Sequence, residues 1–487
     1  MFFRGVWGYL PANIAQGLVG LLSITLFTRI LTPDAYGLYA LGFSVMTLGH
    51  TIVFTWLEAA MARFYAAEQT QGRLPDHFAT LHRAFWIMGL VFLPLAGVAL
   101  WLWPAGQGLK LAAGAGLAAI PGRCLIKLVQ EHRRAAGDVA AASGLDIVQT
   151  LGGFGLGALF AWAGLGGAAP LVGAGAIALV CLPFVLPREL ALGRGGRLQP
   201  DQLKAYAAYG LPLSASLILA LALATTDRFL IAAFLDAKSV GAYHAAYSLA
   251  NRTLDVMFIW LGAAGGPALV MALERGGRPA LEKAAREQAS TLLLITLPAA
   301  VGLALVARPL AELMVGEGLR EDAAQVTPWI AVGAFFAGTC TYYLNQSFTL
   351  ARRPSVLLAS MAFPAVANVA LNLILIPRFG VIGAAWATAA SYAFGALASM
   401  TLGVRTGAMP IPWGTLGKCA LASAAMAGSV LLIPAFGGVF ELAAKAAAGA
   451  AVYGLIAWAL DAAGVRTHAN RVLGSRLLKA FRAGRTA

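Results

Sequence analysis

Uncharged apolar runs of helical length recur along the whole chain, and they limit what it can fold into. The run from Ile147 to Pro187 alone has 41 residues without a charge, enough for two membrane spans of about 20 residues each. Only 11% of the 487 residues are charged and 60% are hydrophobic, whereas a soluble domain carries roughly 25% charged residues. So little polar surface cannot cover a globule in water, which excludes a soluble protein.

The runs predict an all-α polytopic membrane protein with fourteen spans, because only helices satisfy every backbone polar group within lipid in segments of this length. The predicted spans are 8–31, 36–58, 83–103, 108–130, 143–163, 168–187, 205–231, 239–268, 288–307, 325–350, 355–376, 380–402, 415–434 and 438–461. The first run is too long for a signal-peptide core and is predicted to stay as a span.

Lysine and arginine set the predicted orientation. With the N-terminus in the cytoplasm, most of the 35 basic residues fall in inner loops and tails, such as Arg133–Arg134 and Arg188–Lys204. The longest outer loop, Glu312–Asp322, is acidic. The positive-inside rule therefore predicts both termini in the cytoplasm, in a cell inner membrane. The net charge of +14 marks topology rather than a nucleic-acid surface, and no nucleic-acid partner is expected.

An internal repeat predicts two parallel six-helix lobes. Gly37-Leu38-Tyr39 matches Gly241-Ala242-Tyr243, and Gly164-x-x-Gly167-Ala168-Ala169 matches Gly380-x-x-Gly383-Ala384-Ala385. Both offsets correspond to six spans. The predicted divisions are an N-terminal lobe 1–195, a C-terminal lobe 196–405, a two-helix hairpin 406–462 and a basic cytoplasmic tail 463–487. The tail, with Val472, Leu477, Leu478 and Phe481 among its basic residues, is either an amphipathic surface helix or a simple topology signal.

Three segments resemble a known family. They are Phe27-Thr28-Arg29-Ile30-Leu31-Thr32-Pro33-Asp34-Ala35-Tyr36-Gly37-Leu38-Tyr39, Asp227-Arg228-Phe229 with Gly241-Ala242-Tyr243, and Asn368 through Ile376 with Pro377-Arg378-Phe379-Gly380-Val381-Ile382-Gly383-Ala384-Ala385-Trp386. They look like helix junctions of bacterial polysaccharide transporters, the O-antigen flippase-like branch of the multidrug/oligosaccharidyl-lipid/polysaccharide (MOP) exporter superfamily.

The resemblance implies two lobes around a central cavity and alternating access. The implied cargo is a polyprenyl-diphosphate-linked oligosaccharide, moved from the cytoplasmic to the periplasmic leaflet for cell-surface polysaccharide synthesis. Other polysaccharide-assembly proteins are further candidate partners. Because many members of this family have twelve helices, the additional pair distinguishes this chain from them.

Charges within spans are costly, so they usually face a cavity or a partner. Arg123 and Lys127 share one helical face, and Arg252 lies near the middle of its span. Arginine binds phosphate oxygens bidentately, which makes these residues candidates for a diphosphate site. The alternatives are an Arg252–Asp255 pair and a Lys127 that extends to the membrane interface.

Other residues are candidates for binding the cargo or for coupling transport to an ion. Arg228, Asn13 and Gln16 are additional candidates for diphosphate or glycan binding, whereas Arg228 could also mark only a helix mouth. Asp255, Asp227 and Glu58 could couple transport to an ion or a proton, with structural pairing as the alternative. His50 is a further proton candidate. Further polar side chains could bind sugar or join helices, namely Tyr342, Tyr343, Asn345, Gln346, Asn368 and Asn372.

Two competing functions remain at this point. A MATE-like cation-coupled drug exporter would prefer an acidic, aromatic cavity, whereas the deep charges here lean basic. A membrane glycosyltransferase or polymerase would need catalytic groups in a sizeable loop, and no nucleophile motif or nucleotide-binding loop is present. We therefore expect a transporter rather than an enzyme. No cofactor or metal is expected, since an ion gradient or the membrane potential would drive transport.

Overall fold

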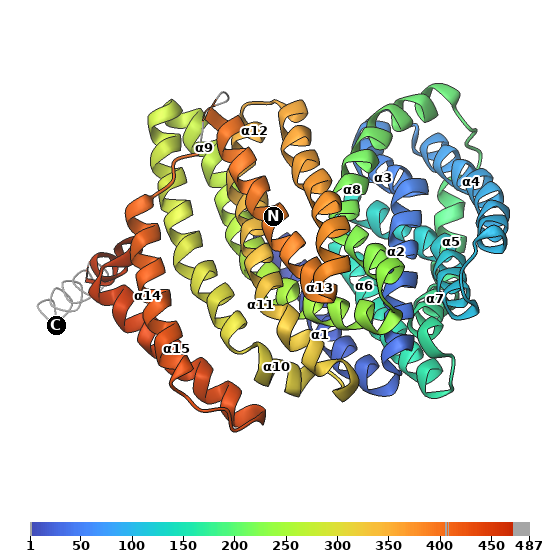
Figure 1. Ribbon diagram of the computed structural model, residues 1–487. Helices are drawn as coiled ribbons and strands as arrows, with labels where there is room; N and C mark the ends of the chain where they lie inside the picture. Colours follow the sequence, from blue (N-terminus) through green and yellow to red (C-terminus); the bar gives the residue numbers. More distant parts are fainter. Residues whose placement is uncertain (1, 405–406, 408, 471–487) are drawn as a thin grey trace, which may run out of the picture. The chain divides into compact units, whose positions relative to one another are not determined.

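The computed structural model describes residues 2–404, 407 and 409–470. Within these residues every regular element is a helix, and no strand occurs. The main helices in chain order are α1 (Phe2–Ile30), α2 (Pro33–Val53), α3 (Thr55–Thr70), α4 (Leu74–Leu102), α5 (Gln107–Ala135), α6 (Val139–Trp162), α7 (Ala169–Leu192), α8 (Pro200–Phe234), α9 (Ala237–Leu305), α10 (Ala307–Met314), α11 (Glu317–Thr339), α12 (Gln346–Leu350), α13 (Pro354–Val404), α14 (Trp413–Leu431) and α15 (Gly438–Ala459) (Figure 1).

Twelve segments are long and apolar enough to cross a membrane, and two of them are double. The helix α9 breaks at Gly277 and α13 breaks at Gly380, each with φ of 61°. Only glycine adopts this combination of φ and ψ readily. When each break is counted as a turn between two helices, the described residues contain the fourteen spans predicted from the sequence.

The helices expose large apolar side chains in the way that lipid-facing helices do. Leu90 and Trp101 on α4 are both 78% exposed, and Trp162 at the end of α6 is 81% exposed. In water such a surface would cause association, whereas in a bilayer it meets acyl chains. The protein is therefore a multi-pass membrane protein.

One predicted span differs from the structure. The sequence predicts a single span over 36–58, but α2 ends at Val53 and α3 begins at Thr55. The residue between them, Phe54, has φ of −116° and is fully buried. The part of the following inner loop up to Thr70 is helical, and its Glu, Ala, Met and Gln residues are all good helix formers.

The chain forms two compact units. Unit 1 consists of Met1–Ala245, Met314–Asp322 and Asn372–Ala384, and unit 2 consists of Ala246–Leu313, Ala323–Leu371 and Ala385–Ala487. The units follow contacts rather than the sequence repeat, so α8 and the beginning of α9 pack within unit 1. The basic tail with its candidate amphipathic helix lies outside the described residues.

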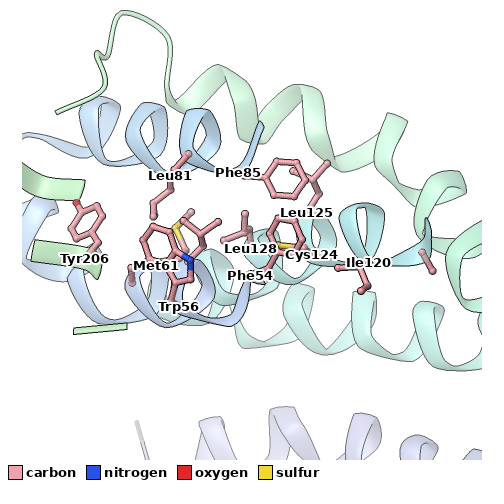
Figure 2. Packing of buried hydrophobic residues seen from close by; sticks show 14 of the residues in the cluster. Phe54, Trp56, Met61, Leu81, Phe85, Ile120, Cys124, Leu125, Leu128 and Tyr206 are labelled. Carbon is pink, nitrogen blue, oxygen red and sulfur yellow. The ribbon is translucent and has the colours of Figure 1, made fainter. Parts of the chain in front are cut away.

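The core of unit 1 lies among α2, α3, α4, α5 and α8. Figure 2 shows its buried side chains, including Phe54, Met61, Phe85, Ile120 and Leu128. Each is fully or almost fully buried. This packing holds the α2–α3 break and the middle of α5 in fixed positions, and these are the elements that carry Glu58 and Arg123.

The repeated glycines of the sequence meet inside unit 1. A Cβ atom on Gly37 would lie 1.6 Å from the carbonyl oxygen of Ala237, and one on Gly241 would lie 3.1 Å from that of Pro33. The beginnings of α2 and α9 can therefore approach this closely only because both positions are glycine. The Gly-x-Tyr signature that revealed the repeat thus marks a backbone contact.

In unit 2, α14 and α15 form a hairpin that packs against the second half of α9 (Figure 1). The Tyr453 hydroxyl donates a hydrogen bond to the carbonyl of Leu294 at 2.7 Å, and the hydroxyls of Ser290 and Thr415 lie 3.3 Å apart. These polar contacts tie the hairpin to the remainder of unit 2.

Candidate functional site

The break between α2 and α3 carries a pair of titratable side chains. His50 lies in the last turn of α2 and Glu58 in the first turn of α3, with His50 Nε2 2.7 Å from Glu58 Oε1. A helix C-terminus favours a cation and an N-terminus favours an anion, so each residue suits its helix end. The sequence names both only as separate proton or ion candidates, and the structure brings them together.

Arg123 lies on α5, which packs closely against α2. A Cβ atom on Gly116 would lie 2.9 Å from the carbonyl oxygen of Gly42, so glycine permits the close approach. Arg123 is half-buried and interacts electrostatically with Glu58 and Tyr39. It makes no hydrogen bond or ion pair with any residue that the structure describes. Its guanidinium therefore has donors available for a ligand.

Lys127, one turn further along α5, has a direct partner. Its Nζ lies 3.5 Å from Glu131 Oε1, and its side chain is 38% exposed. Glu131 also accepts a hydrogen bond from Arg134 at 2.7 Å. Lys127 thus belongs to an ion-pair network near the end of α5.

Asp227 and Arg228 are both buried on α8. Asp227 is fully buried and accepts hydrogen bonds from the Tyr243 hydroxyl at 2.5 Å and from Asn372 at 2.6 Å. Arg228 donates to the hydroxyl of Ser44 at 3.1 Å. Both residues therefore join helices inside unit 1 and do not lie at an open helix mouth.

Arg252 and Asp255 lie on α9 in unit 2, and both side chains are exposed. Each acts electrostatically on the other, but no direct ion pair or hydrogen bond joins either of them to another described residue. The structural-pair alternative for Arg252 therefore lacks the direct contact that it requires. Exposed charges in the apolar middle of a helix demand a polar surrounding, since lipid alone would be costly.

An aromatic pair lies one turn beyond Asp255. The rings of Phe258 and Tyr342 are stacked, with centroids 6.0 Å apart and planes at 15°. A Cβ atom on Gly262 would lie 2.3 Å from Tyr342 Cδ1, so glycine makes room for the ring. Tyr342 lies in a π-helical segment, Cys340–Leu344, and such segments often occur at functional sites. The sequence names Tyr342 as a sugar candidate but does not reveal this platform.

The remaining polar candidates fall into two groups. Asn13 and Gln16 are exposed on α1. In contrast, Tyr343 donates to the carbonyl of Pro410 at 2.5 Å, and Asn345 accepts from Ser399 at 2.9 Å. The first group remains accessible to a ligand, whereas the second joins segments of unit 2.

Sequence reasoning missed a group of polar contacts near the beginnings of α4 and α8 and the ends of α3, α5 and α7. His132 Nδ1 lies 3.0 Å from Glu189 Oε2, and His77 Nδ1 lies 2.6 Å from the Tyr206 hydroxyl. Gln202 donates to Glu68 at 2.9 Å. These residues come from regions predicted as loops or span ends, where scattered histidines gave no signal of contact.

Comparisons with known proteins agree with this architecture. The profile of a family described as "Polysaccharide biosynthesis protein" matches residues 26–321. No curated protein sequence matches significantly. The structure of the lipid II flippase MurJ in an inward closed conformation aligns with a TM-score of 0.76 at 13% identity, covering 93% of this chain and 98% of that chain.

Drug transporters align less fully. An inward-facing multidrug resistance MATE family transporter of the MOP superfamily has a TM-score of 0.58 at 15% identity, covering 80% of this chain and 100% of that chain. A Vibrio cholerae MATE transporter has a TM-score of 0.55 at 17% identity, covering 83% of this chain and 95% of that chain. Such identities show a shared fold only.

The family profile spans more than half of the chain and includes the α1–α2 and α8–α9 junctions that carry the resemblance. The fold over nearly the whole length is similar to that of the lipid II flippase MurJ. The chain therefore belongs to the family described as "Polysaccharide biosynthesis protein".

Proposed function

We propose that this protein moves a polyprenyl-diphosphate-linked oligosaccharide from the cytoplasmic to the periplasmic leaflet of the inner membrane, by alternating access. The observation that carries the proposal is a pair of arginines, Arg123 in unit 1 and Arg252 in unit 2. Both lie in membrane-length helices, and neither has a hydrogen bond or ion pair within the described chain. A cation in a span is costly unless an anion contacts it directly, and the diphosphate of the cargo would supply that direct contact.

The surroundings of Arg252 suit the rest of such a cargo. The Phe258–Tyr342 pair offers an aromatic face beside a cation and a carboxylate, and Asp255 acts electrostatically on Tyr342. Sugars have apolar faces that pack on aromatic rings and hydroxyls that hydrogen-bond to carboxylates. In this proposal Arg252 binds phosphate, while Asp255 and Tyr342 contact the adjoining sugar.

The extent of the structural similarity favours a flippase over a drug exporter. The alignment with MurJ covers 93% of this chain, so the unmatched residues are fewer than those of the α14–α15 hairpin and at least part of the hairpin is matched. The first MATE alignment covers only 80% of the chain. The two cations without a direct partner, Arg123 and Arg252, also favour an anionic cargo, while Asp255 beside Arg252 is assigned to the adjoining sugar.

The test uses proteoliposomes that contain a polyprenyl-diphosphate-linked oligosaccharide, with transport measured as accessibility of the glycan to an added glycosidase. Arg123→Ala and Arg252→Ala should each reduce transport about tenfold or more, since a charge-assisted hydrogen bond contributes roughly 1.5–3 kcal/mol. Lysine at either position should restore part of the rate, because it keeps the charge but not the bidentate geometry.

The matched control is Arg275→Ala, which removes an exposed cation from the same helix as Arg252. It should transport at the wild-type rate. Normal transport by both site variants would refute the site. Export of cationic drugs by a wild-type protein that leaves the glycan lipid unmoved would refute the function.

A further inference from the structure

The backbone of Tyr342 has a side-chain partner to which the proposed transport mechanism assigns no role. Gln288, on the part of α9 that follows the turn at Gly277, donates a hydrogen bond from Nε2 to the carbonyl of Tyr342 at 3.3 Å. The two residues are 54 positions apart in the chain, and both belong to unit 2. Gln288 therefore holds the segment that carries the ring assigned above to the sugar.

Two glycines make room for the side chains around this segment. A Cβ atom on Gly265 would lie 2.2 Å from Gln288 Nε2, and one on Gly338 would lie 2.3 Å from Phe258 Cδ2. Real Cβ atoms essentially never come within 3.0 Å of another atom. The amide of Gln288 and the ring of Phe258 can therefore occupy their positions only because these two residues are glycine.

The Phe258–Tyr342 pair is built reciprocally. Phe258 precedes Gly262 by four residues on α9, and Gly338 precedes Tyr342 by four residues on α11 and its π-helical continuation. Helical residues four apart lie on the same face, and each ring packs over the glycine of the other helix. The ring of Tyr342 is thus fixed as long as its backbone stays in place.

The backbone of Tyr342 lies in the least regular part of this arrangement. In the π-helical segment Cys340–Leu344, the N–H of Asn345 donates to the carbonyl of Cys340, five residues earlier, at 2.9 Å. A change from π-helical to α-helical pairing shifts the side chains by one position, which corresponds to a rotation of about 100°. The hydrogen bond from Gln288 opposes such a shift at Tyr342.

The polar end of Tyr342 is available to a ligand. Tyr342 is half-buried, and its hydroxyl makes no hydrogen bond with a residue that the structure describes. Asp255 is exposed and acts electrostatically on Tyr342. A displacement of the ring would separate the hydroxyl from Asp255, whereas Arg252 would keep its position on α9. Gln288 therefore affects the groups assigned to the sugar and not the cation assigned to the phosphate.

We propose that Gln288 is a positioning residue that determines recognition of the sugar next to the diphosphate. It does not contact the cargo itself, but it holds the Tyr342 ring and hydroxyl beside Asp255. Gly265 contributes to the same recognition, because it admits the amide of Gln288. The inference rests on the proposed function, in which Tyr342 contacts the sugar and Arg252 binds the phosphate.

The experiment separates recognition of the sugar from recognition of the diphosphate. Transport of the oligosaccharide lipid by proteoliposomes is measured over a range of its concentrations, with sugar-free polyprenyl diphosphate as a competitive inhibitor. Gln288→Met keeps the length of the side chain but removes its N–H donors. It should raise the KM for the oligosaccharide lipid about fivefold, an effect within the range of one hydrogen bond.

The inhibition constant of sugar-free polyprenyl diphosphate should stay at the wild-type value in Gln288→Met, because this ligand has no sugar for Tyr342 to contact. Arg252→Ala, in contrast, should weaken binding of both lipids. A merely structural role of Gln288 would weaken binding of both lipids equally, so the comparison distinguishes positioning from a general loss of structure.

Gly265→Ala is a second variant that leaves Gln288 unchanged. Its added methyl group would displace the amide of Gln288, which is the flexible end of that side chain, and it should reproduce the rise in KM. The matched control on α9 is Gly302→Ala. The atom nearest to its Cβ would be Met426 Cε at 3.9 Å, an ordinary contact, so this variant should transport like the wild type.

Two results would overturn the positioning role. They are an unchanged KM for the oligosaccharide lipid in Gln288→Met, and an equal loss of affinity for the two lipids. If Gln288→Met fails to fold, as judged by its melting temperature in detergent, the same two results with Gly265→Ala decide the question. A wild-type protein that transports no oligosaccharide lipid would instead refute the proposed function.

Discussion

Charged side chains within the helices differ in whether they have a direct partner. His50 pairs with Glu58, Lys127 with Glu131 and Lys445 with Glu441. Arg123 and Arg252 do not pair in this way within the described chain. This difference distinguishes side chains that are held by a direct ion pair from the two arginines whose donors our proposal assigns to the cargo.

The Lys445–Glu441 pair on α15 provides a test of residue-level stability. The two groups lie 2.6 Å apart with side chains 12% and 3% exposed. Lys445→Met leaves a buried carboxylate without its cation, which should lower the free energy of unfolding by about 3 kcal/mol. Adding Glu441→Gln removes the charge but keeps an acceptor for the N–H of Gly437, so the double variant should recover most of the loss. Unfolding in detergent measures both, and a double variant less stable than Lys445→Met would contradict the explanation.

The sequence shows which charged residues interrupt the spans, but it does not show which of them meet. Arg123, Arg252 and Glu58 are candidate site residues because a charge that interrupts an apolar run can be recognised from the sequence alone. The contact of His50 with Glu58 depends on the helix break at Phe54. No glycine or proline at this position indicates the break in the sequence. The partners of Asp227 come from α9 and α13, and no local pattern specifies such distant contacts.

At the scale of helices, two glycines define where long helices turn. Gly277 and Gly380 have φ of 61°, so a side chain at either position is strained. Gly277→Ala and Gly380→Ala should each lower the free energy of unfolding by about 1–2 kcal/mol. The control is Gly97→Ala in α4, where a Cβ atom would meet nothing within 4 Å and stability should not fall. Equal stability of all three variants in thermal unfolding would rule out the turns as strained positions.

Helix α9 begins with a cap whose contribution depends on pH. Asp236 Oδ1 accepts a hydrogen bond from the N–H of Ser239 at 2.7 Å, and this bond lowers the pKa of Asp236 below its usual value of 3.8. A lowered pKa in the folded state means that the stabilisation is present above pH 3.8. It is lost as the pH falls through the lower, folded-state value.

Asp236→Ala should therefore lower the free energy of unfolding by about 1 kcal/mol at pH 7. The gap between wild type and variant should narrow below pH 4, as the wild-type cap becomes protonated. Asp236→Asn is the control, because asparagine caps without a titrating group and should stay close to wild type at pH 7. Melting temperatures across this pH range measure the effect, and a gap that widens in acid would have the wrong sign.

At the scale of the whole molecule, hydropathy was enough to predict the number of spans. Every predicted span overlaps a helix of the structure, because lipid demands long apolar segments with internally satisfied backbones. The boundaries were less predictable where helices continue beyond the membrane. The segment around Arg275–Arg286, predicted as an inner loop, is helical on both sides of Gly277, since its Ala, Glu, Lys and Arg residues favour helix in water as well.

The orientation of these fourteen spans is the last prediction, and it determines the direction of transport. With both termini in the cytoplasm, reporter fusions at residue 195 should be cytoplasmic, whereas fusions at residues 315 and 435 should be periplasmic. The reason is the concentration of arginine and lysine at one set of helix ends, including Arg188, Arg194 and Arg197, opposite the acidic segment Glu317–Asp322. Alkaline phosphatase and green fluorescent protein fusions report the two sides independently. Fusions at 195 and 315 on the same side would contradict the number of spans between them. All three reversed would keep the fold but reverse the proposed direction of transport, so these fusions decide which leaflet the cargo leaves.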